Sequence, residues 1–371
     1  MLAHLLRTPL AFALVLGVLV FIHELGHYLA ARWRGVHVEI FSIGFGRPLL
    51  RWHDRVGTEW RVCILPLGGY VKPHGFEGPE EATPEARAAW QSGRTFHDKS
   101  VGSRAIVILA GPVFNFLLAM VLFTVLFATA GQPSTAPIES MKPVIAQVVP
   151  GDSAAAAGLQ ARDQILQING ESMPTISAVK RRVGEAPGQQ IRLQIERDGR
   201  IQVLPVTIGG LTGSGHGLIG VYFASAPAKR LSPGAAIIGG IGETWSVSVQ
   251  TLSGLWKMLS GHASVDQLGG PLRIAQLSGQ VAQLGVASLV SFIALLSINL
   301  GLINLFPIPI LDGGRLVFYA FEALRGRPLS RQVQEYGFRA GFALIACLFA
   351  FVTFNDLSHL GLFQWVAKLV G

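Results

Sequence analysis

Four stretches of this chain are apolar and long enough to cross a lipid bilayer: residues 9–31, 105–130, 284–306 and 338–357. A segment in hydrocarbon must satisfy its backbone hydrogen bonds internally, so each stretch is predicted to form an α-helix. The composition agrees, because 50% of the residues are hydrophobic and 14% are charged. The predicted fold class is a polytopic α-helical membrane protein with four transmembrane helices.

The first apolar stretch contains the motif His23-Glu24-Leu-Gly-His27. Residues four apart on a helix share one face, so both imidazoles can bind the same Zn²⁺ while Glu24 approaches a water at its open position. On the exposed face of a soluble helix such a pattern often occurs by chance, because His and Glu are common there. Ionisable side chains within a membrane cost free energy, so they are expected to bind a ligand such as a metal ion. We therefore predict His23 and His27 as zinc ligands and Glu24 as a general base.

A carboxylate late in the chain is the predicted third zinc ligand. Pro307 and Pro309 must break the third apolar helix, and exposed backbone at membrane depth is tolerated only where it lines a protein cavity. Asp312 follows these prolines among apolar residues; the alternative is an Asp that caps a helix or turn before two glycines. The longer histidine motif of another class of zinc protease is excluded, since Ala30 and Trp33 stand where it needs Gly and His.

Lysine and arginine are distributed unevenly between the loops. They are dense between the first and second apolar stretches and between the third and fourth, and sparse beside the long central segment. By the positive-inside rule the first and third loops are cytoplasmic, while the central segment lies outside a cytoplasmic (inner) membrane that the chain crosses several times. The net charge of +8 then lies in loops facing lipid headgroups. Without a basic helix or aromatic-interleaved stripe, no nucleic acid is expected as a partner.

The first loop reads as β-structure. Residues 36–41 alternate in polarity, and two further strand-like runs, 47–53 and 58–65, flank a turn at 54–57. Such a hairpin beside the metal motif offers a free edge to which a substrate could add as one more strand. The alternative is an amphiphilic hairpin that lies on the bilayer, and the sequence leaves both open.

Residues 143–223 have the composition of a soluble domain. The patterns predict a strand at 144–150, a short helix at 153–159, a strand at 163–170 that ends in an Asn-Gly turn, a helix at 177–183 and a hairpin of 190–197 with 201–208. This order resembles a PDZ domain of the bacterial protease type. The resemblance implies an α+β domain whose groove takes peptide ends or strands by β-augmentation.

The segment after this domain is amphipathic. Within 231–260, apolar residues line one face of a predicted helix, while Glu243, Gln250 and Lys257 recur on another. We predict that this helix lies at the outer membrane interface and does not span, and that 271–283 behaves in the same way.

Asn115 lies in the middle of the second apolar stretch and therefore needs a hydrogen-bond partner. Packing between helices and direct participation in chemistry are both open to it. Packing is the commoner role for such residues.

The predicted organisation combines the membrane helices with a membrane-associated β-hairpin loop and an inserted extracytoplasmic PDZ domain. Its segments are 1–32, the first transmembrane helix with the His-Glu-x-x-His motif; 33–104, the cytoplasmic β-loop; 105–130, the second transmembrane helix; 135–225, the PDZ domain; 231–283, the interfacial helices; 284–322, the third transmembrane helix with its broken Asn-x-x-Pro-x-Pro-x-Leu-Asp-Gly-Gly segment; and 338–358, the fourth transmembrane helix.

Together these motifs resemble the site-2 protease family of intramembrane zinc metalloproteases. The resemblance implies a zinc-dependent endopeptidase that cuts single-span membrane proteins, such as an anti-sigma factor or a remnant signal peptide, in regulated intramembrane proteolysis. It also implies that Zn²⁺ is bound by His23, His27 and Asp312, that Glu24 is the base, and that Asn304 contacts the substrate or transition state. One PDZ domain is found where better-known members carry two. The motifs are His23 to His27, Gly44-Phe-Gly46, Gly68-Gly-Tyr70, Gly111-Pro-Val-Phe-Asn115 and Asn304 to Gly314.

The sequence suggests two other classes of function. A non-catalytic membrane scaffold would capture peptide ends on the PDZ domain around a structural zinc, but structural zinc sites are normally closed by four protein ligands, and here three and a Glu are found. A transporter with a midplane metal site would be expected to show an internal repeat, which the sequence lacks.

Overall fold

The structure is a computed structural model that describes residues 2–76, 83–84, 88, 90, 93–132, 140–149, 151–209, 218–224, 229–262 and 269–359. Its chain divides into two compact units. The helical unit comprises Met1–Ala128 with Ser232–Gly371, and the inserted unit comprises Thr129–Leu231. Each unit has its own hydrophobic core.

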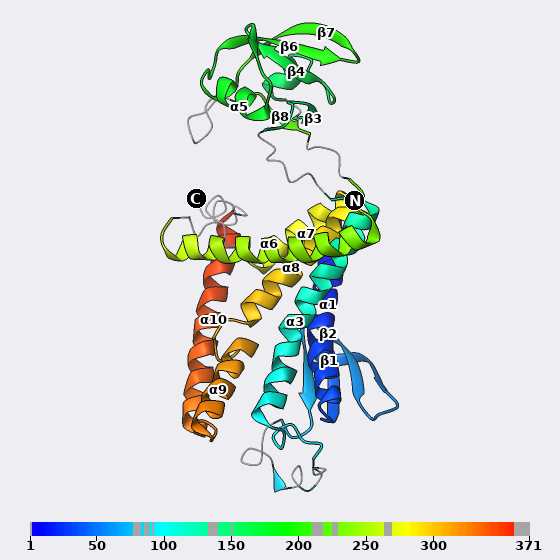
Figure 1. Ribbon diagram of the computed structural model, residues 1–371, viewed down its shortest axis with the longest axis vertical. Helices are drawn as coiled ribbons and strands as arrows, with labels where there is room; N and C mark the ends of the chain where they lie inside the picture. Colours follow the sequence, from blue (N-terminus) through cyan, green and yellow to red (C-terminus); the bar gives the residue numbers. More distant parts are fainter. Residues whose placement is uncertain are drawn as a thin grey trace. The chain divides into compact units, whose positions relative to one another are not determined.

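Long helices dominate the helical unit. Four of them are long and apolar enough to cross a membrane: α1 from Arg7 onward, α3, α8, and α10 as far as Leu357. The predicted class of a polytopic helical membrane protein is thereby confirmed. The helices of this unit are α1 (Leu2–Trp33), α3 (Val101–Thr129), α6 (Pro233–Leu259), α7 (Pro271–Gln283), α8 (Val286–Asn304), α9 (Asp312–Arg325) and α10 (Arg331–His359) (Figure 1).

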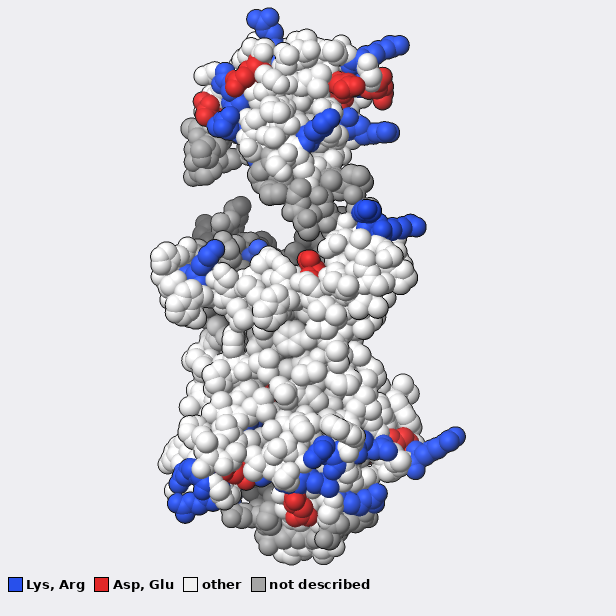
Figure 2. All heavy atoms as spheres, in the orientation of Figure 1, with Lys and Arg blue, Asp and Glu red and all other residues white. Residues whose placement is uncertain are grey.

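The spanning helices run in roughly one direction, and α6 lies across them at one end of the helical unit (Figure 1). The beginning of α1 and the end of α10 lie at this same end. On the visible face, the middle of the helical unit is nearly bare of Lys, Arg, Asp and Glu, and charges gather at the end opposite α6 (Figure 2). An uncharged belt of this kind is what a bilayer requires, and a helix across its end is typical of an interfacial helix.

Three spanning helices begin earlier than their apolar sequence indicates, and the first of them, α1, begins at Leu2 and not at residue 9. α3 begins at Val101 and not at residue 105, because Ser100 Oγ accepts a hydrogen bond from the backbone amide of Ser103 at 3.3 Å. α10 begins at Arg331 and not at residue 338, and Arg331 forms an ion pair at 3.0 Å with Glu335 one turn later. Hydropathy detects the apolar part of a helix, so polar first turns escape it.

Glycines allow α3 to approach both α1 and α8 closely. A Cβ on Gly26 of α1 would overlap the backbone carbonyl of Ala110 on α3. A Cβ on Gly301 of α8 would lie 3.2 Å from the carbonyl oxygen of Pro112, also on α3. Inside a membrane, helices associate through close van der Waals packing, which small residues permit. These contacts hold α3 against the two helices that carry most of the predicted site.

The predicted hairpin is formed by β1 (Val38–His53) and β2 (Glu59–Pro73), which pair antiparallel. Asp54 organises its turn, since the carboxylate accepts hydrogen bonds from the backbone amide of Thr58 at 3.0 Å and from the hydroxyl of Tyr28 at 2.9 Å. Tyr28 belongs to α1, so this bond fixes the hairpin against the helix that carries the histidine motif.

Polar contacts tie α6 and α7 to the spanning helices. Thr251 Oγ1 on α6 donates a hydrogen bond to Asn299 Oδ1 on α8 at 3.2 Å. The buried carboxylate of Asp356 on α10 accepts hydrogen bonds from the backbone amides of Gly270 at 3.0 Å and Arg273 at 3.1 Å, where α7 begins. A carboxylate at a helix N-terminus satisfies unpaired amides and interacts favourably with the helix dipole.

The longer strands and both helices of the inserted unit follow one another in the order predicted from the sequence. Its four-stranded sheet has the order β5-β4-β6-β7, and the short β8 pairs with β3. β5 and β8 were missed, because two and three residues are too few to show a period. The elements are β3 (Ile145–Val148), α4 (Ser153–Ala156), β4 (Gln164–Ile168), β5 (Glu171–Ser172), α5 (Ile176–Gly184), β6 (Gln190–Arg197), β7 (Arg200–Thr207) and β8 (Val221–Phe223).

Candidate metal centre

Three side chains that could hold a metal ion meet in the helical unit. Asp312 Oδ2 lies 3.2 Å from Nε2 of His23 and 3.5 Å from Nε2 of His27. The two Nε2 atoms are 3.3 Å apart, and one ligand atom from each residue lies within 4.8 Å of the others. Asp312 Oδ2 is buried and has no hydrogen-bond partner among the described residues. Two imidazoles and an unpartnered carboxylate oxygen fit Zn²⁺, which in catalytic sites takes three protein ligands and a water.

α3 contacts the Nδ1 atoms of both imidazoles. Nδ1 of His27 donates a hydrogen bond of 2.8 Å to the backbone carbonyl of Val107, which leaves Nε2 as the nitrogen with a free lone pair. Nδ1 of His23 lies 3.0 Å from the side-chain amide of Asn115. Both rings are therefore oriented by a residue of another helix.

Asn115 contacts a candidate ligand and also joins two helices. It is fully buried, and its Oδ1 has no hydrogen-bond partner in the described part of the chain. If Nε2 of His23 faces a metal, Nδ1 carries the proton, and a rotated amide would present Oδ1 to accept it. The backbone carbonyl of Asn115 accepts a hydrogen bond from Ser297 Oγ on α8 at 2.8 Å. The packing role left open by the sequence is present, and so is a contact to the candidate metal site.

We expect an Asn115→Leu variant to bind zinc about 10- to 100-fold more weakly than the wild type, because His23 loses the group that orients its ring. Competition with a chromophoric chelator measures this affinity. Ser297→Ala is the matched control, since it removes the bond to the Asn115 carbonyl without touching His23. Unchanged zinc affinity in Asn115→Leu would contradict the orienting role.

Gly111 lies where α3 passes closest to the histidines. A Cβ at this position would overlap Nε2 and Cε1 of His27 and would lie 2.8 Å from Cε1 of His23. In the sequence, Gly111 belongs to the motif Gly111-Pro-Val-Phe-Asn115, which by itself indicates no function for this glycine. No local pattern marks which glycine of a spanning helix faces a ligand, so this role became visible only in the packed structure.

The break after α8 brings Asp312 to the histidines. α8 ends at Asn304 and α9 begins at Asp312, as the two intervening prolines predict. Two glycines allow the start of α9 to pack closely against the segment that follows α8. A Cβ on Gly313 would overlap the carbonyl of Leu305, and one on Gly314 would overlap the carbonyl of Ile308. Asp312 also occupies the first turn of α9. The two interpretations of this residue, ligand and helix-terminal Asp, are therefore compatible.

A cavity of about 440 Å³ adjoins the three potential ligands. Glu24 and Val71 line this cavity, and the backbone of Val71 lies beside the Glu24 carboxylate. Asn304, the last residue of α8, is half-buried and lines the same cavity. All the side chains predicted for the site, namely His23, Glu24, His27, Asn304 and Asp312, thus line one cavity.

The end of β2 forms another wall of this cavity. Residues 40–43 of β1 have partners on both sides, residues 69–72 on one and residues 59–62 on the other. Within the described pairings, the segment 69–73 is joined to β1 alone, so it is an edge. Gly69 lies at the metal end of this edge, because a Cβ there would come within 3.1 Å of Cγ of Glu24.

Comparisons with known proteins identify the family of this chain. The family model described as "Peptidase family M50" matches residues 11–348. A protein of Rhizobium meliloti, named as a zinc metalloprotease, is 41% identical over 94% of this chain and 96% of its own length. The regulator of sigma-E protease of Salmonella typhimurium is 32% identical over 94% of this chain and 98% of its own length.

Among solved structures, the PDZ domain of an SdrC-like protein from Listeria monocytogenes aligns with 24% of this chain and 94% of its own length, at 14% identity and a TM-score of 0.21. The family match and the relatives extend over almost the whole chain. The chain therefore belongs to peptidase family M50, the family of the site-2 proteases, and is a zinc metalloprotease of that family.

Proposed function

We propose that this protein is an intramembrane endopeptidase that hydrolyses a peptide bond within the transmembrane segment of single-span membrane proteins. The observation that carries the proposal is the cluster of His23, His27 and Asp312, because α1 brings both histidines and is one of the helices long enough to span a membrane. A hydrolytic site at this depth meets the segments of other proteins that lie in the bilayer. Anti-sigma factors and remnant signal peptides are the proposed kinds of substrate, in regulated intramembrane proteolysis.

In the proposed reaction His23, His27 and Asp312 hold Zn²⁺. The bound ion supplies Lewis acidity, which polarises the scissile carbonyl and acidifies the attacking water. Glu24 takes a proton from this water and passes it to the nitrogen of the leaving amine. The second proton of the water follows it, so the cut produces one carboxylate and one ammonium group. The side-chain amide of Asn304 donates a hydrogen bond to the carbonyl oxygen as negative charge develops on it.

The edge of β2 is the proposed platform for the substrate. A transmembrane helix bonds its own carbonyls internally, so it must unwind locally before a peptide bond can be attacked. An unwound segment leaves amides and carbonyls unpaired, and pairing with residues 69–73 would satisfy some of them beside Glu24. This favours the substrate-edge interpretation of the hairpin over a hairpin that merely lies on the bilayer.

Purified protein and two model single-span substrates test the proposal. We expect mass spectrometry to locate the cut inside the span, and we expect a zinc chelator to abolish cleavage and added Zn²⁺ to restore it. A span interrupted by Gly and Pro should be cut faster than a polyleucine span, because it unwinds at lower cost. Cleavage confined to residues outside the span would overturn the intramembrane assignment, and equal rates for the two spans would contradict the unwinding step.

We further propose that the first and third loops are cytoplasmic and that the inserted unit is on the outer side of the inner membrane, as the distribution of Lys and Arg favours. In sealed inside-out vesicles, added protease should then leave the inserted unit intact. Its digestion in intact vesicles would reverse the orientation.

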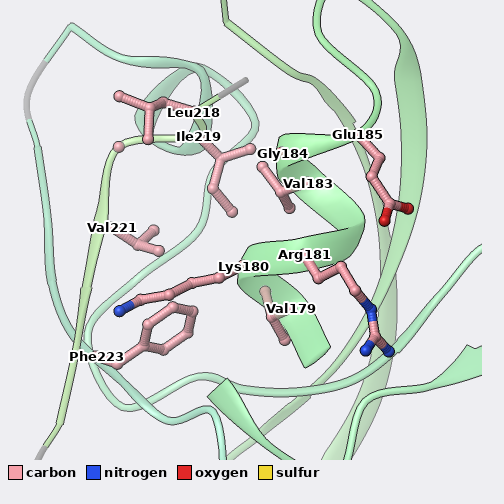
Figure 3. A pocket seen from close by; sticks show the side chains of 11 residues that line it. Val179, Lys180, Arg181, Val183, Gly184, Glu185, Leu218, Ile219, Val221 and Phe223 are labelled. Carbon is pink, nitrogen blue, oxygen red and sulfur yellow. The ribbon is translucent and has the colours of Figure 1, made fainter. Parts of the chain in front are cut away.

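The inserted unit has a groove of its own, and a peptide strand is its proposed ligand. A cavity of about 540 Å³ lies between α5 and the segment that contains β8 (Figure 3). Figure 3 shows Val183 from α5 opposite Ile219 and Val221, with Phe223 at one end. Among the described strands β8 pairs with β3, so a peptide could add to its other edge and bury apolar side chains in the groove.

A Val221→Arg variant is expected to weaken capture of an extended apolar peptide by the full-length protein at least tenfold, because the charge enters the apolar groove. Fluorescence anisotropy with a labelled peptide measures the affinity. Val203→Arg is the control, since Val203 is 56% exposed on β7 and does not line the groove. Equal losses in both variants would indicate a general disturbance of the domain and contradict binding in this groove.

A further inference from the structure

A second cavity adjoins the one beside the metal cluster. It has a volume of about 520 Å³ and shares Phe76 and Arg315 with the first cavity. Residues from α3, α9 and α10 line it, together with residues that follow the β-hairpin. Its walls are rich in aromatic rings, those of Phe76, Phe96, Phe318, Tyr319 and Phe338.

The basic groups of this second cavity differ in their partners. Arg104 forms an ion pair at 2.6 Å with Glu322, and its guanidinium also lies 5.0 Å from the ring centroid of Tyr319. Nε2 of His97 lies 3.1 Å from a carboxylate oxygen of Asp98.

Arg315 is the exception among these basic groups. It has no ion pair with a carboxylate of the residues that the structure describes. Its guanidinium lies over the ring of Phe76, at 4.6 Å from the centroid, and 6.0 Å from the centroid of Phe338. Stacking engages the face of a guanidinium and leaves its N–H donors, which point outward in the plane, able to bind an anion.

Arg315 also lies close to the candidate metal ligands. It follows Asp312 by three residues on α9, so the two side chains lie on the same side of the helix about one turn apart. Along β2, Gly69 lies beside Glu24, and the chain then continues to Phe76, over which Arg315 stacks. Arg315 therefore lines both the cavity in which the bond is cut and the aromatic cavity next to it.

We propose that Arg315 and the aromatic cavity bind the carboxylate that hydrolysis creates and so hold the N-terminal product as it leaves the metal. This inference rests on the proposed endopeptidase function and adds a product site to it. The attacking water supplies the second oxygen of this carboxylate, and both of its protons leave with the amine product as an ammonium group. A guanidinium binds both carboxylate oxygens through paired N–H donors, which an uncharged carboxamide cannot match. The neighbouring rings accept the apolar side chains behind the new terminus.

Peptide binding to the full-length, metal-free protein in detergent tests this site separately from catalysis. The probes are a labelled peptide of Leu, Ala and Gly with a free C-terminal carboxylate and the same peptide with a C-terminal carboxamide. We expect the wild type to prefer the carboxylate about 10- to 100-fold, as one charge-assisted hydrogen-bonded pair provides. Arg315→Gln should remove the preference and Arg315→Lys should keep part of it. Arg325→Gln, an exposed arginine on the same helix, should leave it unchanged.

Three results would overturn the product site. One is an equal preference in the wild type and Arg315→Gln, and another is the absence of any preference in metal-free wild type. The third is loss of the preference when one equivalent of phosphatidylglycerol is added, which would assign the cavity to a lipid headgroup. Because no bond is cut in these measurements, failure of the model substrates to be cleaved would refute the proposed function without deciding whether Arg315 binds carboxylates.

Discussion

A Gly111→Ala variant is expected to bind zinc more than about a hundredfold more weakly than the wild type and to lose cleavage with it. The added methyl group would overlap Nε2 of His27 and would lie 2.8 Å from Cε1 of His23. The His27 ring cannot move aside easily, because its Nδ1 is hydrogen-bonded to the Val107 carbonyl at 2.8 Å and the residue is only 9% exposed. Either the imidazole leaves the metal position or α3 moves away from α1, and both separate the ligands.

Metal content of the purified protein, measured by atomic emission, checks this result. Gly102→Ala is the matched control, because Gly102 belongs to the same helix and a Cβ there would meet nothing within 4 Å. The control should retain zinc and cleavage. Full zinc content in Gly111→Ala would show that the histidines do not hold the ion at the positions found here, and the proposed ligand set would have to be abandoned.

A Glu24→Gln variant is expected to retain zinc and to lose about 10²- to 10⁴-fold in kcat. The amide keeps the size of the carboxylate and its place beside the Val71 backbone, but it cannot take a proton from water. Since the proposed ligands are the two histidines and Asp312, replacing Glu24 removes no donor from the metal. The loss should therefore appear in turnover and not in affinity for zinc or substrate.

Single-turnover cleavage of the model substrate and zinc content, measured on the same sample, test this expectation. Glu335→Gln makes the same chemical change on α10, where Glu335 pairs with Arg331, and should leave both quantities unchanged. Loss of zinc in Glu24→Gln would identify Glu24 as a ligand. Undiminished turnover would remove it as the base.

These two predictions depend on the sequence to different degrees. Glu24 follows from a local pattern, because two histidines four apart on a helix define a face and the intervening turn carries the carboxylate. Gly111 does not, since nothing within α3 distinguishes it from a glycine such as Gly102 that touches nothing. The difference appears only when α3 is packed against α1.

The inserted unit illustrates the same division at the level of the fold. Its longer strands and α5 were predicted from alternating polarity and turn residues, whereas the three-residue β8 was not. β8 forms because β3 offers it a partner, and one side of the candidate peptide groove depends on it. The pairing of β3 with β8 joins segments far apart in the sequence, so neither segment alone predicts it.

The sequence by itself determined the properties that follow from local periodicity and from the cost of polar groups in lipid: the spanning helices, the shared face of His23 and His27, and the break that precedes Asp312. Only the tertiary structure decided which groups surround that face, including the Val107 carbonyl and the stacked Arg315. The physical reason is that hydrogen bonding and hydropathy act along a single helix, whereas these contacts arise from close packing of helices distant in sequence.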